Sequence, residues 1–209
     1  MALKRALTVE NIEAFKPITL PFAGEWFDAI GAPELTGSWL VYGGSANGKT
    51  RFAMQLARYL ANFCKVTYDS LEEGLSASMQ KTIMETGLKS VSKNFQFLDK
   101  EPIADLRIRL KKRGSADVVI IDSLQYSGLN YAEYRALRDE FRKKLFVFIS
   151  HADGKSPRGR VAQAVKYDAF VKIYIESFKA YVISRFGGGA EYVIWATGAE
   201  NYGNNNLNR

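Results

Sequence analysis

The segment "VYGGSANGKT", residues 41–50, constrains this chain more than any other feature. Gly43, Gly48, Lys49 and Thr50 fit the pattern G-x-x-x-x-G-K-[ST]. An apolar strand pattern, "SWLVYGG", precedes the loop, and apolar residues at helical spacing follow it in residues 49–63. Strand, glycine loop and helix in that order are the context that this phosphate-binding motif requires. The sequence therefore predicts a loop that surrounds phosphate groups with its backbone N–H groups.

The chemistry of such a loop suggests what its residues do. The loop backbone would approach the phosphates closely, and the following helix would add its positive N-terminal dipole. Lys49 would reach the terminal phosphates as a point charge, and Thr50 would offer its hydroxyl to Mg²⁺. We expect a nucleotide and Mg²⁺ as cofactors. The expected nucleotide contacts are Gly43, Gly44, Ser45, Ala46, Asn47, Gly48, Lys49, Thr50 and Arg51.

Length and charge narrow the class of protein. The chain has 209 residues, which suits one domain with small additions, and a net charge of +7. A basic excess of this size favours an anionic partner such as nucleotide or nucleic acid. The single cysteine, Cys64, can form no internal disulfide, which suits a reducing compartment. We find neither a signal peptide nor a long apolar run, so we expect a cytoplasmic protein without a membrane span, in the bacterial host cytoplasm if phage-encoded.

The order of patterns along the chain predicts an α/β fold. Strand and helix patterns alternate from residue 38 to residue 151, which implies a mostly parallel central sheet flanked by helices. Three further strand patterns, in residues 169–177, 179–188 and 190–198, would extend the sheet as antiparallel strands. We divide the chain into an extension (1–36) that packs on the core or a neighbour, a core (37–198) and a flexible polar tail (199–209).

Acidic residues at the ends of two strand patterns are candidates for the chemistry. "VVIID" ends in Asp122, which we expect to hold Mg²⁺ together with Thr50; the alternative is an aspartate that caps a helix. "YDSLEEG" places Glu72 and Glu73 after the second strand, where one of them would orient or deprotonate the attacking water. We favour Glu72 and leave Glu73 open. His151, the single histidine, ends the strand "FISH", where it would contact the terminal phosphate of the nucleotide; the alternative is a surface histidine without a role.

Taken together, these motifs resemble the RecA superfamily of ATPases. "GGSANGKT", "YDSLEEG", "VVIIDSLQ" and "FISHADG" stand in the order and spacing of its RadA and DnaB-helicase branch. The resemblance covers roughly residues 37–196 and implies a RecA-like P-loop fold, ATP hydrolysis with Glu72 as catalytic base, and assembly into a ring or filament with ATP between subunits. "SRFGGGAEYVIW" is similar to a RadA segment, and by that match Arg185 would be an arginine finger that acts on a neighbour's nucleotide.

Two departures from the pattern separate this chain from a replicative helicase. The helicase branch has a lysine two residues before the finger, where this chain has Ile183. No helical domain, zinc-finger cysteines or protease-like domain accompany the core in this sequence, so we expect a compact ATPase core. Cores of this kind resemble phage and mobile-element recombinases that pair or anneal single strands.

A basic segment after His151 is the candidate DNA contact. "ADGKSPRGRVAQ" carries Lys155, Arg158 and Arg160, and in RecA-like proteins the loop after this strand faces bound single-stranded DNA. Cations on a mobile loop suit phosphate contacts. Tyr126, Tyr131 and Tyr134 follow the strand that ends in Asp122 and would offer stacking faces, or else belong to the core.

Four functions remain open. The leading one is a DNA-stimulated, oligomeric ATPase in recombination or single-strand annealing. The alternatives are a hexameric helicase or packaging motor, a nucleotide-switched regulatory ATPase that does not bind DNA, and a small-molecule kinase. We find no arginine-rich lid of the kind that a kinase needs.

Overall fold

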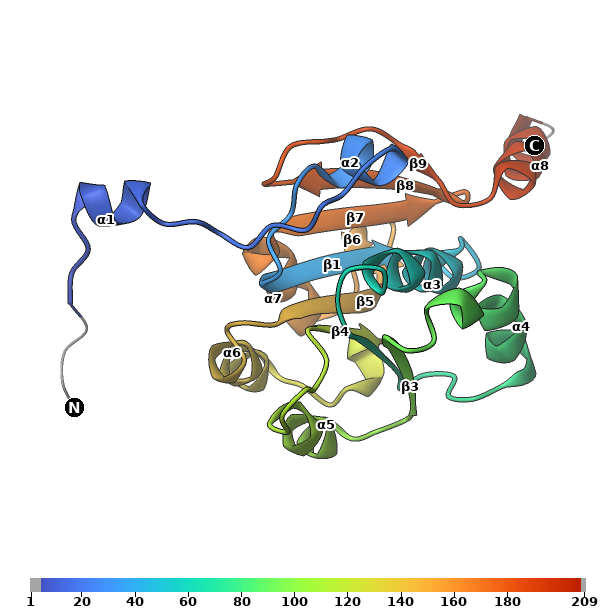
Figure 1. The fold of residues 1–209 in the computed structure, drawn as a ribbon. Coiled ribbons are helices and arrows are strands. Elements are labelled where there is room, and N and C mark those ends of the chain that lie inside the picture. Colours follow the sequence, from blue (N-terminus) through green and yellow to red (C-terminus); the bar gives the residue numbers. More distant parts are fainter. Residues whose placement is uncertain (1–4, 208–209) are drawn as a thin grey trace.

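The computed structural model describes residues 5–207, with side chains for residues 5–201. The first four residues of the predicted extension and the last two residues of the predicted tail lie outside the described residues. The described part forms an α/β fold with a mostly parallel central sheet and antiparallel strands toward the C-terminus, as the sequence predicts (Figure 1). The strands are β1 (Gly37–Gly43), β2 (Val66–Ser70), β3 (Phe95–Asp99), β4 (Val118–Asp122), β5 (Leu145–Asp153), β6 (Ser156–Pro157), β7 (Val171–Glu176), β8 (Lys179–Ser184) and β9 (Tyr192–Val193).

The strand order puts the functional strand ends beside one another. The order is β3-β2-β4-β5-β1-β7-β8-β9, with β6 paired to the end of β5. Strands β1 to β5 and β7 run parallel, whereas β8 and β9 are antiparallel. The carboxyl ends of β1, β2, β4 and β5 therefore meet at one edge of the sheet, which is where open α/β sheets bind ligands.

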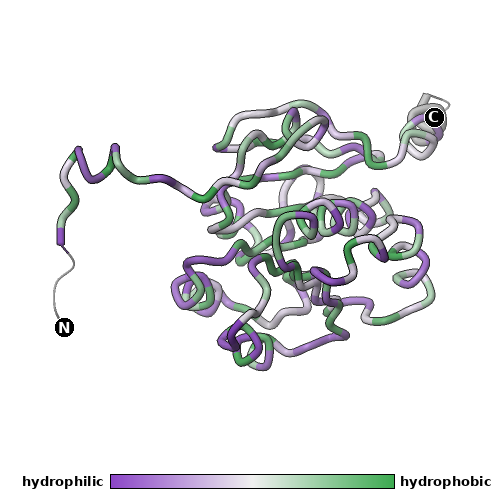
Figure 2. The backbone as a smooth tube through the Cα atoms, viewed as in Figure 1, coloured by the Kyte–Doolittle hydropathy of each residue, from purple (hydrophilic) through white to green (hydrophobic). Residues whose placement is uncertain are grey.

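Helices cover both faces of the sheet. The helical elements are α1 (Val9–Glu13), α2 (Glu25–Ile30), α3 (Lys49–Leu60), α4 (Ala77–Glu85), η1 (Leu88–Val91), α5 (Ile103–Leu110), η2 (Leu124–Tyr126), α6 (Tyr131–Glu140), α7 (Arg160–Asp168) and α8 (Ala196–Leu207). The helices α2, α3 and α4 contribute to one hydrophobic cluster, and α5, α6 and α7 contribute to the other. The apolar strands run through the middle of the molecule, with more polar chain around them (Figure 2).

Side chains along β1 alternate between the two hydrophobic clusters, which explains why this strand is apolar at successive positions. Trp39 and Val41 belong to the first cluster, while Leu40 and Tyr42 belong to the second. A strand covered on both faces must be apolar at successive positions, because neighbouring side chains point to opposite faces. The same continuous apolar pattern in β4 and β5 places these strands in the centre of the sheet.

The predicted extension behaves as two parts. Residues 5–19 are all exposed, and Figure 1 shows α1 at the end of a segment that leaves the body of the molecule. From Leu20 onward the chain packs on its own core. Trp26 stacks on Tyr59 and Tyr192, with ring centroids 5.2 and 4.4 Å away.

Three elements differ from the sequence prediction. The basic segment after His151 forms a hairpin between β5 and β6, and helix α7 then begins at Arg160 because Ala162 and Val165 pack against the second cluster. The last predicted strand shrinks to β9, since only Tyr192 and Val193 reach β8. Residues 196–207 form helix α8 where the sequence predicts strand and then tail.

Candidate functional site

The glycine loop connects β1 to α3, as the motif predicts. Its first glycine, Gly43, lies so close to β7 that an added Cβ would stand 2.2 Å from the carbonyl oxygen of Ile175. Gly48 caps the N-terminus of α3 with φ at 96°, a left-handed conformation that favours glycine. The two glycines of the motif are thus required by close packing and by the turn into the helix.

Asn47 fastens the loop to the turn between β7 and β8. Its Oδ1 accepts a hydrogen bond from the Ser177 N–H at 2.8 Å, and its Nδ2 donates to the Ser45 carbonyl at 3.0 Å. Asn47 therefore holds the shape of the loop. Arg51 points away from the pocket toward Glu85, at 3.0 Å, and its guanidinium lies 5.6 Å from the Trp195 ring centroid.

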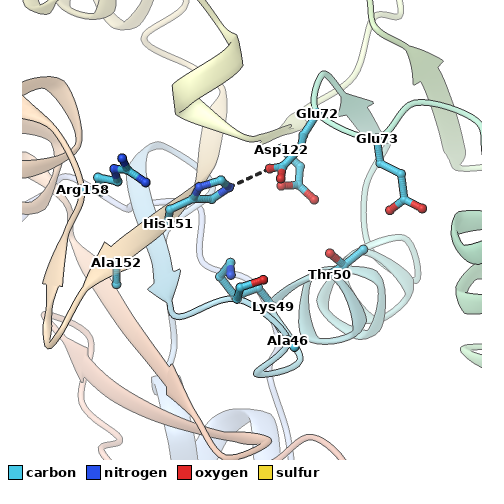
Figure 3. A pocket seen from close by; sticks show the side chains of 10 residues that line it. Ala46, Lys49, Thr50, Glu72, Glu73, Asp122, His151, Ala152 and Arg158 are labelled. Carbon is cyan, nitrogen blue, oxygen red and sulfur yellow. Dashed lines mark hydrogen bonds and ion pairs between the residues drawn. The ribbon is translucent and has the colours of Figure 1, made fainter.

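A pocket of about 510 Å³ opens beside the loop at the carboxyl edge of the sheet. This volume is in the range of ligand-binding pockets, which run from about 300 to 1,000 Å³. Figure 3 shows how the lining side chains converge on it from the loop and three strand ends. The pocket is lined by Ser45, Ala46, Lys49, Thr50, Glu72, Glu73, Asp122, His151, Ala152 and Arg158.

Lys49 lies in the pocket, and a bound phosphate could replace its present hydrogen-bond acceptor. Its Nζ donates a hydrogen bond to the Gly44 carbonyl at 2.7 Å. Burial lowers the pKa of Lys49, and the nearby carboxylates of Asp122 and Glu72 oppose that shift. A partly desolvated cation with one backbone acceptor can transfer to phosphate oxygens with little loss of protein contacts.

Asp122 ends β4 inside the pocket and is only 7% exposed. Burial raises the pKa of Asp122 to about 6, while a hydrogen bond from the buried Tyr68 hydroxyl lowers it. Within residues 5–207 no group of three or more His, Cys, Asp or Glu residues could hold a metal alone. The Thr50 hydroxyl and the Asp122 carboxylate, which both line the pocket, fit Mg²⁺, because this ion keeps waters and phosphate oxygens as most of its ligands.

The two glutamates after β2 differ in their contacts. The backbone N–H of Glu72 donates to the Asp122 carbonyl at 3.1 Å, which fixes Glu72 against the end of β4. Its Oε2 accepts from the Ser123 hydroxyl at 3.0 Å and lies 2.8 Å from His151 Nε2 (Figure 3). Glu73 instead accepts hydrogen bonds from the Ser76 and Ser78 hydroxyls at the start of α4. Both glutamates line the pocket, but in the described part of the chain only Glu72 is bound to the residues that end β4 and β5.

A residue without a predicted role, Gln125, joins the strand ends. Its Oε1 accepts from the His151 N–H at 3.2 Å, and its Nε2 donates to the Ser150 hydroxyl and to the Arg158 carbonyl, both at 2.9 Å. Gln125 therefore holds the end of β5 in position. Its place in "DSLQ", three residues after Asp122, was the only signal, and it does not indicate the contact with β5.

The remaining predicted site residues lie elsewhere. Arg185 hydrogen-bonds through its backbone to Phe170 at the start of β7, the edge opposite the loop, and its guanidinium lies 4.8 Å from the Phe170 ring centroid. Lys155 and Arg160 are exposed at the hairpin tip and the start of α7. Tyr134 is buried at 0% exposure, so it cannot offer a stacking face, whereas Tyr126 and Tyr131 are exposed.

The helices of residues 5–207 include none with the length and hydrophobicity of a transmembrane span.

Solved structures of other proteins have a similar fold. The chain is similar to the flagellar accessory protein FlaH from Methanocaldococcus jannaschii, with a TM-score of 0.60 and 19% identity over 85% of this chain and 94% of that one. It is similar to a second solved structure, which is an ATPase domain (TM-score 0.51, 16% identity, 75% of this chain and 80% of that one). It is also similar to a KaiC-like protein from Pyrococcus horikoshii OT3 (TM-score 0.54, 22% identity, 77% of this chain and 85% of that one).

The chain therefore has the fold of the RecA-like P-loop ATPases, and the resemblance seen in the sequence is confirmed for the fold. No protein-family model matches the sequence, and no curated protein matches it.

Proposed function

We propose that this chain is a magnesium-dependent ATPase that acts on DNA, in recombination or single-strand annealing. The observation that carries the proposal is the convergence of Lys49, Thr50, Glu72, Asp122 and His151 on one pocket beside the glycine loop. A phosphate cradle, a site for Mg²⁺ and a positioned carboxylate are the parts that hydrolysis of a nucleoside triphosphate needs.

Each residue has a definite task in this mechanism. The loop backbone and Lys49 bind the phosphates. Thr50 and Asp122 would hold Mg²⁺, which when bound would neutralise charge on the phosphates. Glu72 orients the attacking water and accepts its proton, which a carboxylate within hydrogen-bond reach of the water can do. His151, 2.8 Å from Glu72, would contact the terminal phosphate and so tie the state of the nucleotide to the end of β5.

Assembly into a homo-oligomer with ATP between subunits is part of the proposal. Arg185 lies too far from the pocket of its own chain to act there, so a catalytic role for it requires a second copy. The exposed segment at residues 5–19 supports assembly, because it presents large apolar side chains to solvent: Leu7, Val9, Ile12, Phe15 and Ile18. Apolar groups gathered on an exposed segment usually mark an interaction surface.

Contact with DNA is supported by charge and by connection to the pocket. Lys155, Arg158 and Arg160 lie on the hairpin and helix that follow His151, and the net charge is +7. The Arg158 N–H donates to the His151 carbonyl at 2.8 Å, so a change at His151 would reach this basic segment directly. Single-stranded DNA is the proposed partner.

Steady-state ATP hydrolysis, with and without single-stranded DNA at low and high salt, tests the proposal. We expect hydrolysis that needs Mg²⁺ and that DNA stimulates, with stimulation fading as salt rises, because phosphate contacts release counterions. Lys49→Ala should abolish hydrolysis without changing the melting temperature. Hydrolysis that survives in Lys49→Ala would refute the assignment of the loop.

A second candidate is a nucleotide-switched regulatory ATPase without DNA. Arg158 lines the nucleotide pocket, so only Lys155 and Arg160 of the three basic residues lie outside it. The smaller number of cations left for DNA favours this candidate. Hydrolysis that is indifferent to DNA at all salt concentrations would support this candidate. Unwinding of a forked duplex would instead support a helicase.

A further inference from the structure

Arg158 belongs to the nucleotide pocket, although its sequence context suggests a DNA contact. Together with Lys49 it supplies the Lys and Arg side chains of the pocket lining in the described part of the chain. Figure 3 shows Arg158 beside His151, on the side of the imidazole away from Asp122. The side of the pocket opposite the proposed Mg²⁺ site is therefore bordered by a guanidinium.

The backbone of Arg158 is fixed at the level of His151. Its N–H donates to the His151 carbonyl at 2.8 Å, and its carbonyl accepts from Gln125 Nε2 at 2.9 Å. The preceding residue, Pro157, pairs with Ala152 in the antiparallel β5–β6 ladder. The starting point of the side chain is thus set by the same network that positions His151.

The side chain, by contrast, is exposed and only weakly paired. It is 63% exposed, and within residues 5–207 its ion pairing is limited to one contact of 3.9 Å between its Nε and Asp153 Oδ2. Asp153 is itself 73% exposed, and an exposed ion pair of this length contributes little to stability. A stronger anion in the pocket can therefore draw the guanidinium away from Asp153.

The arrangement of charges indicates which anion that is. Glu72 is engaged by His151 and Ser123, so it does not neutralise Arg158. A terminal phosphate reached by Lys49 and facing Glu72 and His151 would lie next to Arg158, whereas a diphosphate leaves that position empty. A planar guanidinium can donate two parallel hydrogen bonds to phosphate oxygens.

We propose that Arg158 contacts the terminal phosphate of the nucleotide bound by its own chain and makes the pocket select nucleoside triphosphates over diphosphates. This inference rests on the proposed function and adds a residue to its site. It differs from the role expected for Arg185, which lies at the opposite edge of the sheet and requires a neighbouring copy. Arg158 would therefore act even in a monomer.

Calorimetric titration of the full chain with ATPγS and with ADP, each with Mg²⁺, tests the proposal. Arg158→Ala should weaken ATPγS binding about 10- to 100-fold, as expected for lost charge-assisted hydrogen bonds, and leave ADP binding unchanged. Arg158→Lys should give an intermediate loss, because lysine keeps the charge without the planar fork. Arg113→Ala is the matched control, an exposed arginine between α5 and β4 at the other edge of the sheet.

A second variant separates loss of the cation from disturbance of the hairpin. Asp153→Asn removes the competing carboxylate and should keep or strengthen ATPγS binding. If Asp153→Asn weakens ATPγS binding as Arg158→Ala does, the hairpin and not the guanidinium is responsible, and the inference is wrong.

The remaining outcomes are also decisive. An Arg158→Ala variant with an unchanged preference for ATPγS over ADP, whether or not it loses single-stranded DNA binding, overturns the inference and leaves the proposed function standing. A wild-type chain that binds neither nucleotide overturns the proposed function and this inference with it.

Discussion

Replacing Asp69 by asparagine should raise the free energy of unfolding, relative to the wild type, by more above pH 7 than near pH 4. Asp69 lies in β2 between β3 and β4 and is 0% exposed. Its Oδ1 accepts a hydrogen bond from the Glu101 N–H at 3.1 Å, and its Oδ2 has no partner among the described residues. Burial raises the pKa of Asp69 to about 7; the Glu101 N–H and Arg109 oppose this rise, and the Glu101 carboxylate adds to it.

The sign and size of the effect follow from proton linkage. An ordinary aspartate in the unfolded chain has a pKa near 3.9, so between about pH 4 and pH 7 the folded protein holds a proton that the unfolded chain has lost. Stability therefore falls as the pH rises through this window. A shift of about three pH units corresponds to about 4 kcal/mol of lost stability once the carboxyl is ionised, at 1.36 kcal/mol per unit.

Asparagine cannot ionise, so the variant should escape this loss. Its side-chain oxygen can keep the bond from the Glu101 N–H, while its NH₂ group replaces the unpaired Oδ2. An unsatisfied buried donor destabilises by about 1 to 3 kcal/mol, but that term is the same at every pH. The diagnostic quantity is therefore the change with pH of the difference in unfolding free energy between variant and wild type.

Urea unfolding measures that difference at a series of pH values from about 4.5 to about 8, which spans the expected titration of Asp69. It should rise through the window and level off above pH 7. Glu13→Gln, on the exposed helix α1, is the control and should show a flat difference. A flat difference for Asp69→Asn as well would show that Asp69 is ionised without penalty in the folded protein, and the reasoning from burial would be refuted.

The remaining predictions concern the loop, the catalytic carboxylate and the packing of the N-terminal region. Gly43→Ala should lower the unfolding free energy by about 1 to 3 kcal/mol, because the new methyl group would meet the carbonyl of Ile175; an unchanged urea midpoint would contradict this packing. Glu72→Gln should reduce the rate of ATP hydrolysis about 100-fold or more while nucleotide affinity persists, and equal losses in both would assign Glu72 to binding instead. Trp26→Ala should remove the stacking that holds the chain from Leu20 onward and destabilise the protein by about 2 to 4 kcal/mol; limited proteolysis should then cut residues 20–36 faster than in the wild type.

The parts of the fold that could be predicted are those with a strong local signal. The glycine loop of residues 43–50 indicates a strand before it and a helix after it, because the turn that joins these two elements needs glycines at those positions. Continuous apolar runs predicted the central strands β4 and β5, because a strand covered on both faces has no polar position. The elements whose type or length was predicted wrongly lack such signals: β9 is two residues long, and α7 begins inside a segment that is polar and rich in glycine.

The pocket residues also divide into those that a local sequence pattern predicted and those that it did not. Lys49, Thr50, Glu72, Asp122 and His151 were predicted as site residues because each follows a recognisable strand or loop pattern, and parallel strands bring their carboxyl ends together. The sequence left open whether Glu72 or Glu73 is the catalytic base, and both line the pocket. Their contacts differ through hydrogen bonds from Ser123 and from the serines of α4, which belong to separate segments.

The sequence alone determined that this chain has a phosphate loop, a parallel sheet and carboxylates at its edge, because these are encoded in short runs of neighbouring residues. Only the tertiary structure decided that Gln125 joins the strand ends, that Asp69 is buried, and that Arg185 and Arg158 lie at opposite edges of the sheet. Such contacts join residues far apart in the chain, and they depend on strand order and on which neighbours fill the space around a side chain. Neither is encoded in a local pattern, which is why a basic residue beside His151 could be assigned to DNA from its sequence and to the nucleotide from its position.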